Sequence, residues 1–230
     1  MQIVKILMLL LVAPFISNCQ KNITPTGPGF HEKDGPGIEP GVSAALSRYR
    51  SLSLKNISYE LSFAIPPQRD QPVQASERLN FVWRCPEKND KKEKSDKRTA
   101  VPLQLDFRDS AGAISSLTVN DRPVPIVLVR EHLLIDASLL KEGGNTMGIL
   151  FTAGDLSLNR NPDFLYTLLV PDRARTLFPC FDQPDLKAVF TLCLELPNDW
   201  KAVANAPLQD SLEEGDHKQY RYLPSDKIPT

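Results

Sequence analysis

The sequence predicts an all-β fold, either an antiparallel β-sandwich or a saddle-shaped sheet. Apolar and polar residues alternate over several short stretches, which is the period of a strand with one buried face. Turn residues separate these stretches at regular intervals, and Pro outnumbers Gly by 20 to 11, which favours strands and turns over helices. A chain of 230 residues is long enough for one domain with a sizeable core.

The alternation is clearest in residues 56–65, where Ile57, Tyr59, Leu61, Phe63 and Ile65 occupy every second position. Residues 79–85 and 101–107 repeat the pattern. Further strands are expected at 114–119, 124–129, 133–135, 147–152, 165–170, 188–196, 200–204 and 219–223. Residues 42–50 are expected to form one short helix, and residues 136–141 one helical turn before the Gly pair that follows.

The N-terminal residues predict an export signal. A charged start precedes an apolar run over residues 6–13, which is too short to span a bilayer. The run ends at Ile16-Ser17-Asn18-Cys19, which resembles a bacterial lipobox, where the signal is removed before a cysteine that then carries lipid. We expect residues 1–18 to be a lipoprotein signal peptide and Cys19 to anchor the protein in the bacterial cell envelope, in the periplasm or outside the cell. A plain secretory signal with an incidental cysteine is the alternative.

Residues 19–41 are rich in Pro and Gly and poor in apolar residues, so they are expected to form a flexible tether. Residues 42–230 are then the folded β domain. Its charged stretch 87–98 has no apolar residue and is interpreted as a solvated hairpin loop, the alternative being a loop that binds an acidic partner. Lys and Arg total 27 against 28 Asp and Glu, so no basic excess points to nucleic acid.

The most distinctive stretch lies between Arg175 and Pro184 and contains Phe178-Pro179-Cys180-Phe181-Asp182-Gln183. Two prolines bias the residues before them toward extended backbone, so this stretch is a turn between strands. Arg175 and Asp182 are expected to form an ion pair that holds this turn rather than a catalytic pair. The thiol of Cys180, flanked by Pro and Phe, is expected to be packed rather than reactive.

Residues 166–205 resemble the N-terminal domain of the aminopeptidase N family of zinc metallopeptidases. The matching residues are Tyr166-Thr167, Ala174-Arg175, Phe178 to Pro184, Leu186 to Phe190, Pro197, Trp200, Ala204 and Asn205. The resemblance implies a saddle-shaped β domain that packs against a separate catalytic domain, in cis or from a split gene, which would hold the zinc and hydrolyse peptides from their N-terminus. Residues 225–230 resemble the lead into a further strand of that family, so the domain is expected to be truncated.

The zinc site of that class needs two His four residues apart on one helix, with a Glu beside the first. The chain has only His31, His132 and His217, and none has a partner at that spacing. The family's Gly-x-Met-Glu-Asn loop is also absent. We therefore expect no catalytic residue, metal or cofactor in this chain, and no activity from it alone. The alternative function is a free-standing, lipid-anchored module that binds peptides or an envelope protein.

Three residues are candidates for the face that meets substrate: Tyr166, Val170 and Asp172. In the family a Glu or Gln three residues after the Tyr-Thr threonine holds the free amine of the substrate. Counted from Thr167, that position is Val170, which cannot pair with an ammonium. Asp172 would supply a carboxylate if the loop were shifted. Cys85, Cys180 and Cys193 are an odd number, which leaves at least one free thiol.

Overall fold

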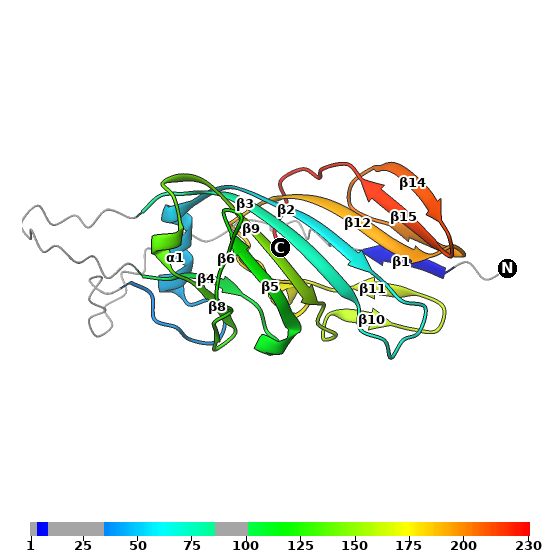
Figure 1. The fold of residues 1–230 in the computed structure, drawn as a ribbon, viewed down its shortest axis with the longest axis horizontal. Helices are drawn as coiled ribbons and strands as arrows, with labels where there is room; N and C mark the ends of the chain where they lie inside the picture. Colours follow the sequence, from blue (N-terminus) through cyan, green and yellow to red (C-terminus); the bar gives the residue numbers. More distant parts are fainter. Residues whose placement is uncertain (1–3, 9–34, 86–100) are drawn as a thin grey trace, which may run out of the picture.

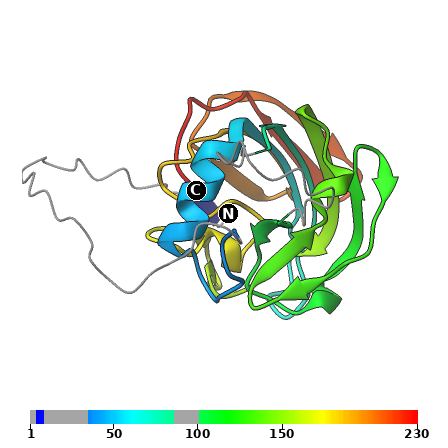
Figure 2. The ribbon, with the colours of Figure 1, turned by 90° about the vertical axis from the view of Figure 1, so that its left-hand side faces the viewer.

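The structure, a computed structural model, describes residues 4–8, 35–85 and 101–230. In these residues fifteen strands form three sheets. The largest sheet has the strand order β14-β15-β12-β2-β3-β9-β5-β6. A four-stranded sheet, β10-β11-β1-β13, and a three-stranded sheet, β4-β8-β7, accompany it. The strands curl around a common core, and helix α1 lies at one end (Figures 1 and 2).

The large sheet consists of β2 (Leu54–Ala64), β3 (Gln74–Trp83), β5 (Ile114–Val119), β6 (Arg122–Pro123), β9 (Gly143–Thr152), β12 (Val189–Pro197), β14 (Leu208–Glu214) and β15 (His217–Tyr222). The small sheets consist of β1 (Val4–Met8), β10 (Leu158–Arg160), β11 (Leu165–Thr167) and β13 (Trp200–Val203), and of β4 (Leu103–Asp106), β7 (Leu128–Val129) and β8 (His132–Ile135). Helix α1 spans Ala44–Ser53, and short 3-10 turns η1, η2 and η3 span Ala111–Ala113, Ala137–Leu139 and Ala174–Thr176.

The alternation read from the sequence is the burial pattern of the long strands. In β2, Tyr59, Leu61 and Phe63 are buried, and β3 buries Leu79 and Phe81 on the same face. Aromatic rings join neighbouring strands of the sheet: the ring of Tyr59 in β2 stacks on that of Phe190 in β12, with 5.0 Å between the centroids. The predicted β fold class is confirmed, and most pairings are antiparallel. Strand β12 is the exception within the large sheet, because it runs parallel to β2.

Most predicted elements are present, with shifted ends. Helix α1 begins after Ser43, whose side chain accepts a hydrogen bond from the Leu46 amide, as expected of an N-cap. The predicted strand at 124–129 is wrong over most of its length, because Pro123 and Pro125 lack the N–H that a ladder needs. Strand β14 was not predicted, since all seven of its residues are exposed and show no alternation.

The predicted tether at 19–41 is wrong for its last residues. Residues 35–41 lie on the domain, and Pro36 is buried. Side chains from the small sheet β4-β8-β7 and its β7–β8 turn donate to the backbone carbonyls of this segment. A segment rich in Gly and Pro is expected to be mobile, but its backbone carbonyl groups can still accept hydrogen bonds. The side chains that donate these bonds lie elsewhere in the chain, so the composition of the segment does not predict them.

Residues 4–8, which the sequence places in the apolar leader, form β1. This strand pairs in parallel with β11 and with β13. A short apolar run fits a strand as well as a leader, and periodicity alone does not separate the two. The charged stretch 87–98 and Cys19 lie outside the described residues.

Candidate functional site

The stretch singled out in the sequence connects the small sheet to the large one. Strand β11 ends at Thr167, η3 follows at Ala174–Thr176, and the chain then turns to enter β12. A backbone bridge fixes the middle of the turn: the Asp106 amide donates to the Cys180 carbonyl at 2.8 Å, and the Cys180 amide donates back at 2.9 Å. The turn therefore rests on the end of β4.

The three predicted substrate-face residues lie at or near the surface of this connection. Tyr166 is half-buried, and its ring stacks on the exposed Phe164 with centroids 6.0 Å apart. Val170 is 40% exposed and precedes a cis peptide bond to Pro171. Asp172 has an exposed side chain, and its Oδ2 lies 3.2 Å from the Arg175 guanidinium. The Asp172 carboxylate is thus already paired.

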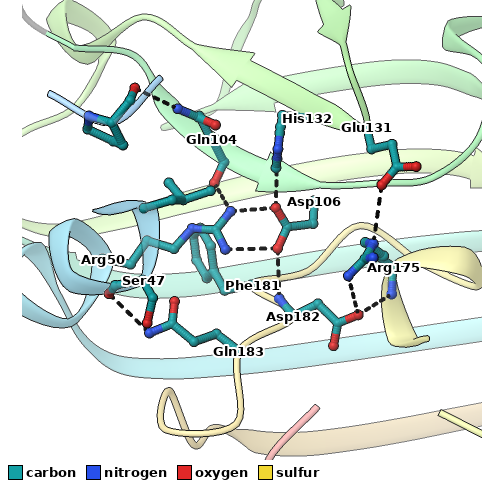
Figure 3. Close-up of polar contacts among 12 residues, drawn as sticks. Ser47, Arg50, Gln104, Asp106, Glu131, His132, Arg175, Phe181, Asp182 and Gln183 are labelled. Carbon is teal, nitrogen blue, oxygen red and sulfur yellow. Dashed lines mark hydrogen bonds and ion pairs between the residues drawn. The ribbon is translucent and has the colours of Figure 1, made fainter. Parts of the chain in front are cut away.

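Arg175 and Asp182 interact as the sequence predicted. The Arg175 amide donates to Asp182 Oδ2 at 3.1 Å, and the guanidinium lies 3.7 Å from the same oxygen. A third carboxylate, that of Glu131, lies 3.5 Å from Arg175 Nε (Figure 3). Burial raises the pKa of Asp182 to about 6, even though the Arg175 amide and charge oppose that rise. This pair closes the turn.

A second buried ion cluster, centred on Asp106, adjoins this pair. The Arg50 guanidinium from α1 binds both carboxylate oxygens of Asp106, at 2.5 and 2.8 Å. His132 Nδ1 lies 2.7 Å from Oδ1, and the Asp182 amide donates to Oδ2 at 3.0 Å. Burial alone would raise the pKa of Asp106, but Arg50 and His132 together lower it below its ordinary value. Figure 3 shows Asp106 between these partners.

This cluster is not evident from the sequence. Gln104 and Asp106 alternate with the apolar residues of β4, a pattern that predicts a solvent-exposed face for these two residues. In the structure all four residues of β4 are buried. Arg50 is fully buried at the inner face of α1, with Phe181 5.4 Å beneath its guanidinium. The one available signal was His132 at the start of an apolar strand, a histidine without a partner at the zinc-ligand spacing.

Most of the remaining turn residues are buried in the core. Phe178, Pro179 and Cys180 are buried, whereas Pro184 is exposed. The Phe178 ring meets Tyr59 edge-on at 6.0 Å. Burial raises the pKa of the Cys180 thiol well above its ordinary value, so the thiol stays protonated and is a poor nucleophile.

The charged side chains of this arrangement form ion pairs with one another. Within the described residues, no group of three His, Cys, Asp or Glu side chains is placed to hold a metal ion. His132 is buried, and His217 lies at the surface beside Asp216, while His31 falls outside the described part of the chain. The described helices include none long and apolar enough to cross a membrane.

Comparisons with known proteins point to one family. Residues 153–230 match the Peptidase M1 N-terminal domain. Aminopeptidase M1 of Arabidopsis thaliana is 38% identical over 64 residues, which are 28% of this chain and 7% of that protein. Aminopeptidase Ey of Gallus gallus is 46% identical over 43 residues, 19% of this chain and 4% of that protein. The chain thus spans a small part of these relatives.

Solved structures show the same fold. Legionella pneumophila aminopeptidase A, in complex with aspartic acid, superimposes with a TM-score of 0.63 at 20% identity, over 80% of this chain and 21% of that one. An M1 zinc metallopeptidase from Deinococcus radiodurans gives a TM-score of 0.57 at 17% identity, over 74% of this chain and 38% of that one. The β domain of this chain therefore shares the fold of these structures, and its residues 153–230 are similar to the Peptidase M1 N-terminal domain.

Proposed function

We propose that this chain is the non-catalytic N-terminal domain of an aminopeptidase N-like zinc metallopeptidase, and that it serves a catalytic domain supplied in cis or by a second chain. The observation that carries the proposal is the match of residues 153–230, which include the turn that the two ion clusters hold in place. In this role the domain presents the loop between β11 and η3 to its partner. Zinc and the hydrolytic residues belong to that partner.

The loop that would face the partner combines a rigid base with exposed side chains. Arg175, at its base, is 6% exposed and pairs with three carboxylates. Val170 and Phe164 are 40% and 44% exposed. A second protein surface would bury them.

A peptidase assay tests the proposal. The full chain, supplied with zinc and aminoacyl-p-nitroanilides, should show no hydrolysis above buffer, and the polypeptide encoded directly after codon 230 should become active or more stable when the two are mixed. Zinc-dependent turnover by this chain alone would overturn the proposal. So would the absence of a zinc-binding HExxH sequence from every reading frame after that codon, if no catalytic chain binds in trans.

Substrate recognition is tested in the same complex. We propose that Val170 occupies the position that in the family holds the free amine of the substrate, so Val170→Glu should lower KM for unblocked peptides through a new ion pair. Asp172→Asn is the matched control, because that carboxylate is committed to Arg175. If Asp172→Asn raised KM while Val170→Glu did nothing, Asp172 would be the amine ligand.

We also propose that Cys19 carries lipid and holds the domain at the bacterial cell envelope. The support is the lipobox-like Ile16-Ser17-Asn18-Cys19 after an apolar run. Mass spectrometry of the N-terminal peptide should find diacylglyceryl-modified Cys19, and Cys19→Ala should move the protein to the soluble fraction. An unmodified Cys19 in a membrane-bound protein would contradict lipid anchoring.

A further inference from the structure

Residues 35–41 lie against the small sheet β4-β8-β7, and we call this segment the strap. Four consecutive backbone carbonyl oxygens of the strap contact polar side chains of that sheet and its β7–β8 turn: those of Pro36, Gly37, Ile38 and Glu39. Gln104 Nε2 lies 3.3 Å and 3.4 Å from the first two oxygens. Arg130 donates to the third at 3.1 Å, and His132 Nε2 lies 2.6 Å from the fourth. The strap is thus held through its main chain.

A glycine with positive φ lies at each end of the strap. Gly35 has a φ of 73°, and a Cβ there would lie 2.2 Å from Val101 Cγ2, so the strap backbone packs directly against the residues before β4. Gly41 has a φ of 77°, and a Cβ there would lie 3.8 Å from Arg175 Nη2. The strap therefore runs from the beginning of β4 to the turn that carries the Arg175–Asp182 pair.

Two of the residues that hold the strap also contact the Asp106 cluster. Gln104 and His132 are both 0% exposed. His132 Nδ1 lies 2.7 Å from Asp106 Oδ1, and the Gln104 backbone carbonyl accepts a hydrogen bond from the Arg50 guanidinium at 2.7 Å. Asp106 in turn accepts a hydrogen bond from the Asp182 amide at 3.0 Å. A continuous set of contacts therefore joins the strap to the turn.

The Gln104 side chain depends on the strap for its hydrogen bonds. Its Nε2 contacts the Pro36 and Gly37 oxygens, and its buried Oε1 has no partner among the residues that the structure describes. Without the strap this buried amide would keep no hydrogen bond to the described part of the chain, which is costly unless water enters. Water beside the cluster would weaken the ion pair of Arg50 and Asp106, because charges attract less strongly in a high dielectric.

We propose that the strap is a conformational device that couples the N-terminal segment to the turn over residues 175–184. The docked strap keeps water from Gln104 and from the Asp106 cluster, whereas the released strap admits water and loosens the turn. Release is accessible because ordering the strap costs conformational entropy, which hydrogen bonds of modest net strength must offset. A protein or protease that captures the strap would therefore loosen the turn. The device concerns the described domain alone and does not depend on the proposed function.

Limited proteolysis and amide hydrogen exchange of the full chain test the coupling. Arg130→Met removes the hydrogen bond to the Ile38 oxygen, so cleavage within the strap should accelerate roughly fivefold. Exchange of the Cys180 and Asp182 amides, which donate to Asp106, should accelerate by the same factor, because their opening passes through the released state. The amides of β3 and β9 should exchange as in the wild type. Arg122→Met, at an exposed position of β6, is the matched control and should change neither rate.

A pair of glycine variants gives a second test. Gly35→Ala should release the strap and raise both rates at least tenfold, because its Cβ would lie 2.2 Å from Val101 Cγ2. Gly37→Ala should change neither, since only Glu39 Oε1, at 3.8 Å, lies within 4 Å of its Cβ. Faster cleavage with unchanged exchange at Cys180 and Asp182 would overturn the proposal, and so would equal acceleration in β3 and β9. Unchanged cleavage in both Arg130→Met and Gly35→Ala would also overturn it, because these contacts would then not hold the strap.

Discussion

Replacing Asp106 by Asn should destabilise the domain more than any other single isosteric change at the turn. The carboxylate accepts four hydrogen bonds: two from Arg50, one from His132 and one from the Asp182 amide. In Asn, one of the two oxygens becomes an NH₂ group, which would face donors. The Arg50 side chain is 0% exposed, so its charge would stay buried without a compensating anion.

Breaking a buried ion pair by removing one partner costs about 3–5 kcal/mol. That is a large share of a typical unfolding free energy of about 5–15 kcal/mol, and it corresponds to a fall in Tm of roughly 10 °C for a domain of this size. Urea unfolding at pH 7, followed by circular dichroism, should show the loss as a lower midpoint at an unchanged m-value.

Two companion variants make the Asp106 result interpretable. Asp210→Asn, on the exposed edge strand β14, should change the unfolding free energy by less than about 0.5 kcal/mol. The double variant Arg50→Met/Asp106→Leu should be more stable than Asp106→Asn, because it removes both buried charges at once. A loss below about 1 kcal/mol for Asp106→Asn, or a double variant no better than the single one, would refute the reasoning.

Three further predictions concern separate parts of the molecule. Asp182 has a folded pKa of about 6 against an ordinary value of 3.8, so the folded state binds more protons between these values and stability falls as pH rises from about 4 to 6. Asp182→Asn should flatten that fall, by up to about 3 kcal/mol, in urea titrations across this range, and an unchanged slope would contradict the assignment. Gly154→Ala should destabilise strongly, because a Cβ there would lie 2.1 Å from the Thr176 carbonyl oxygen, whereas Gly144→Ala meets nothing within 4 Å and is the matched control. Equal melting temperatures for these two variants would be the contrary result. Arg160 donates to four carbonyls of the loop over residues 66–71, so Arg160→Ala should increase amide exchange in that loop while Arg122→Ala, at an exposed position of β6, should not.

The sequence predicted the fold class and most strands because the signal is local. Apolar residues at every second position bury one face of a strand wherever that strand lies, so residues 56–65 could be assigned from their own side chains. The turn around Pro179 was likewise predicted from its prolines, and the Arg175–Asp182 pair from two residues seven positions apart. Strand β14 was not predicted, because none of its residues is buried and its sequence therefore shows no apolar alternation.

The tertiary structure decided which distant groups meet. Strands β2 and β12 pair in parallel although more than 120 residues separate Tyr59 from Phe190, and nothing in either strand encodes that choice. The Asp106 cluster gathers donors from α1, β8 and the turn. Side chains of β4, β8 and the β7–β8 turn bind backbone oxygens of residues 36–39, and every residue carries such an oxygen whatever its side chain. The periodicity of apolar residues predicts whether a side chain is buried, but it does not predict which distant residue that side chain contacts. The sequence thus determined the β fold class and a resemblance to one family over residues 153–230, whereas tertiary packing decided that Asp106 and His132 are buried and which groups they contact.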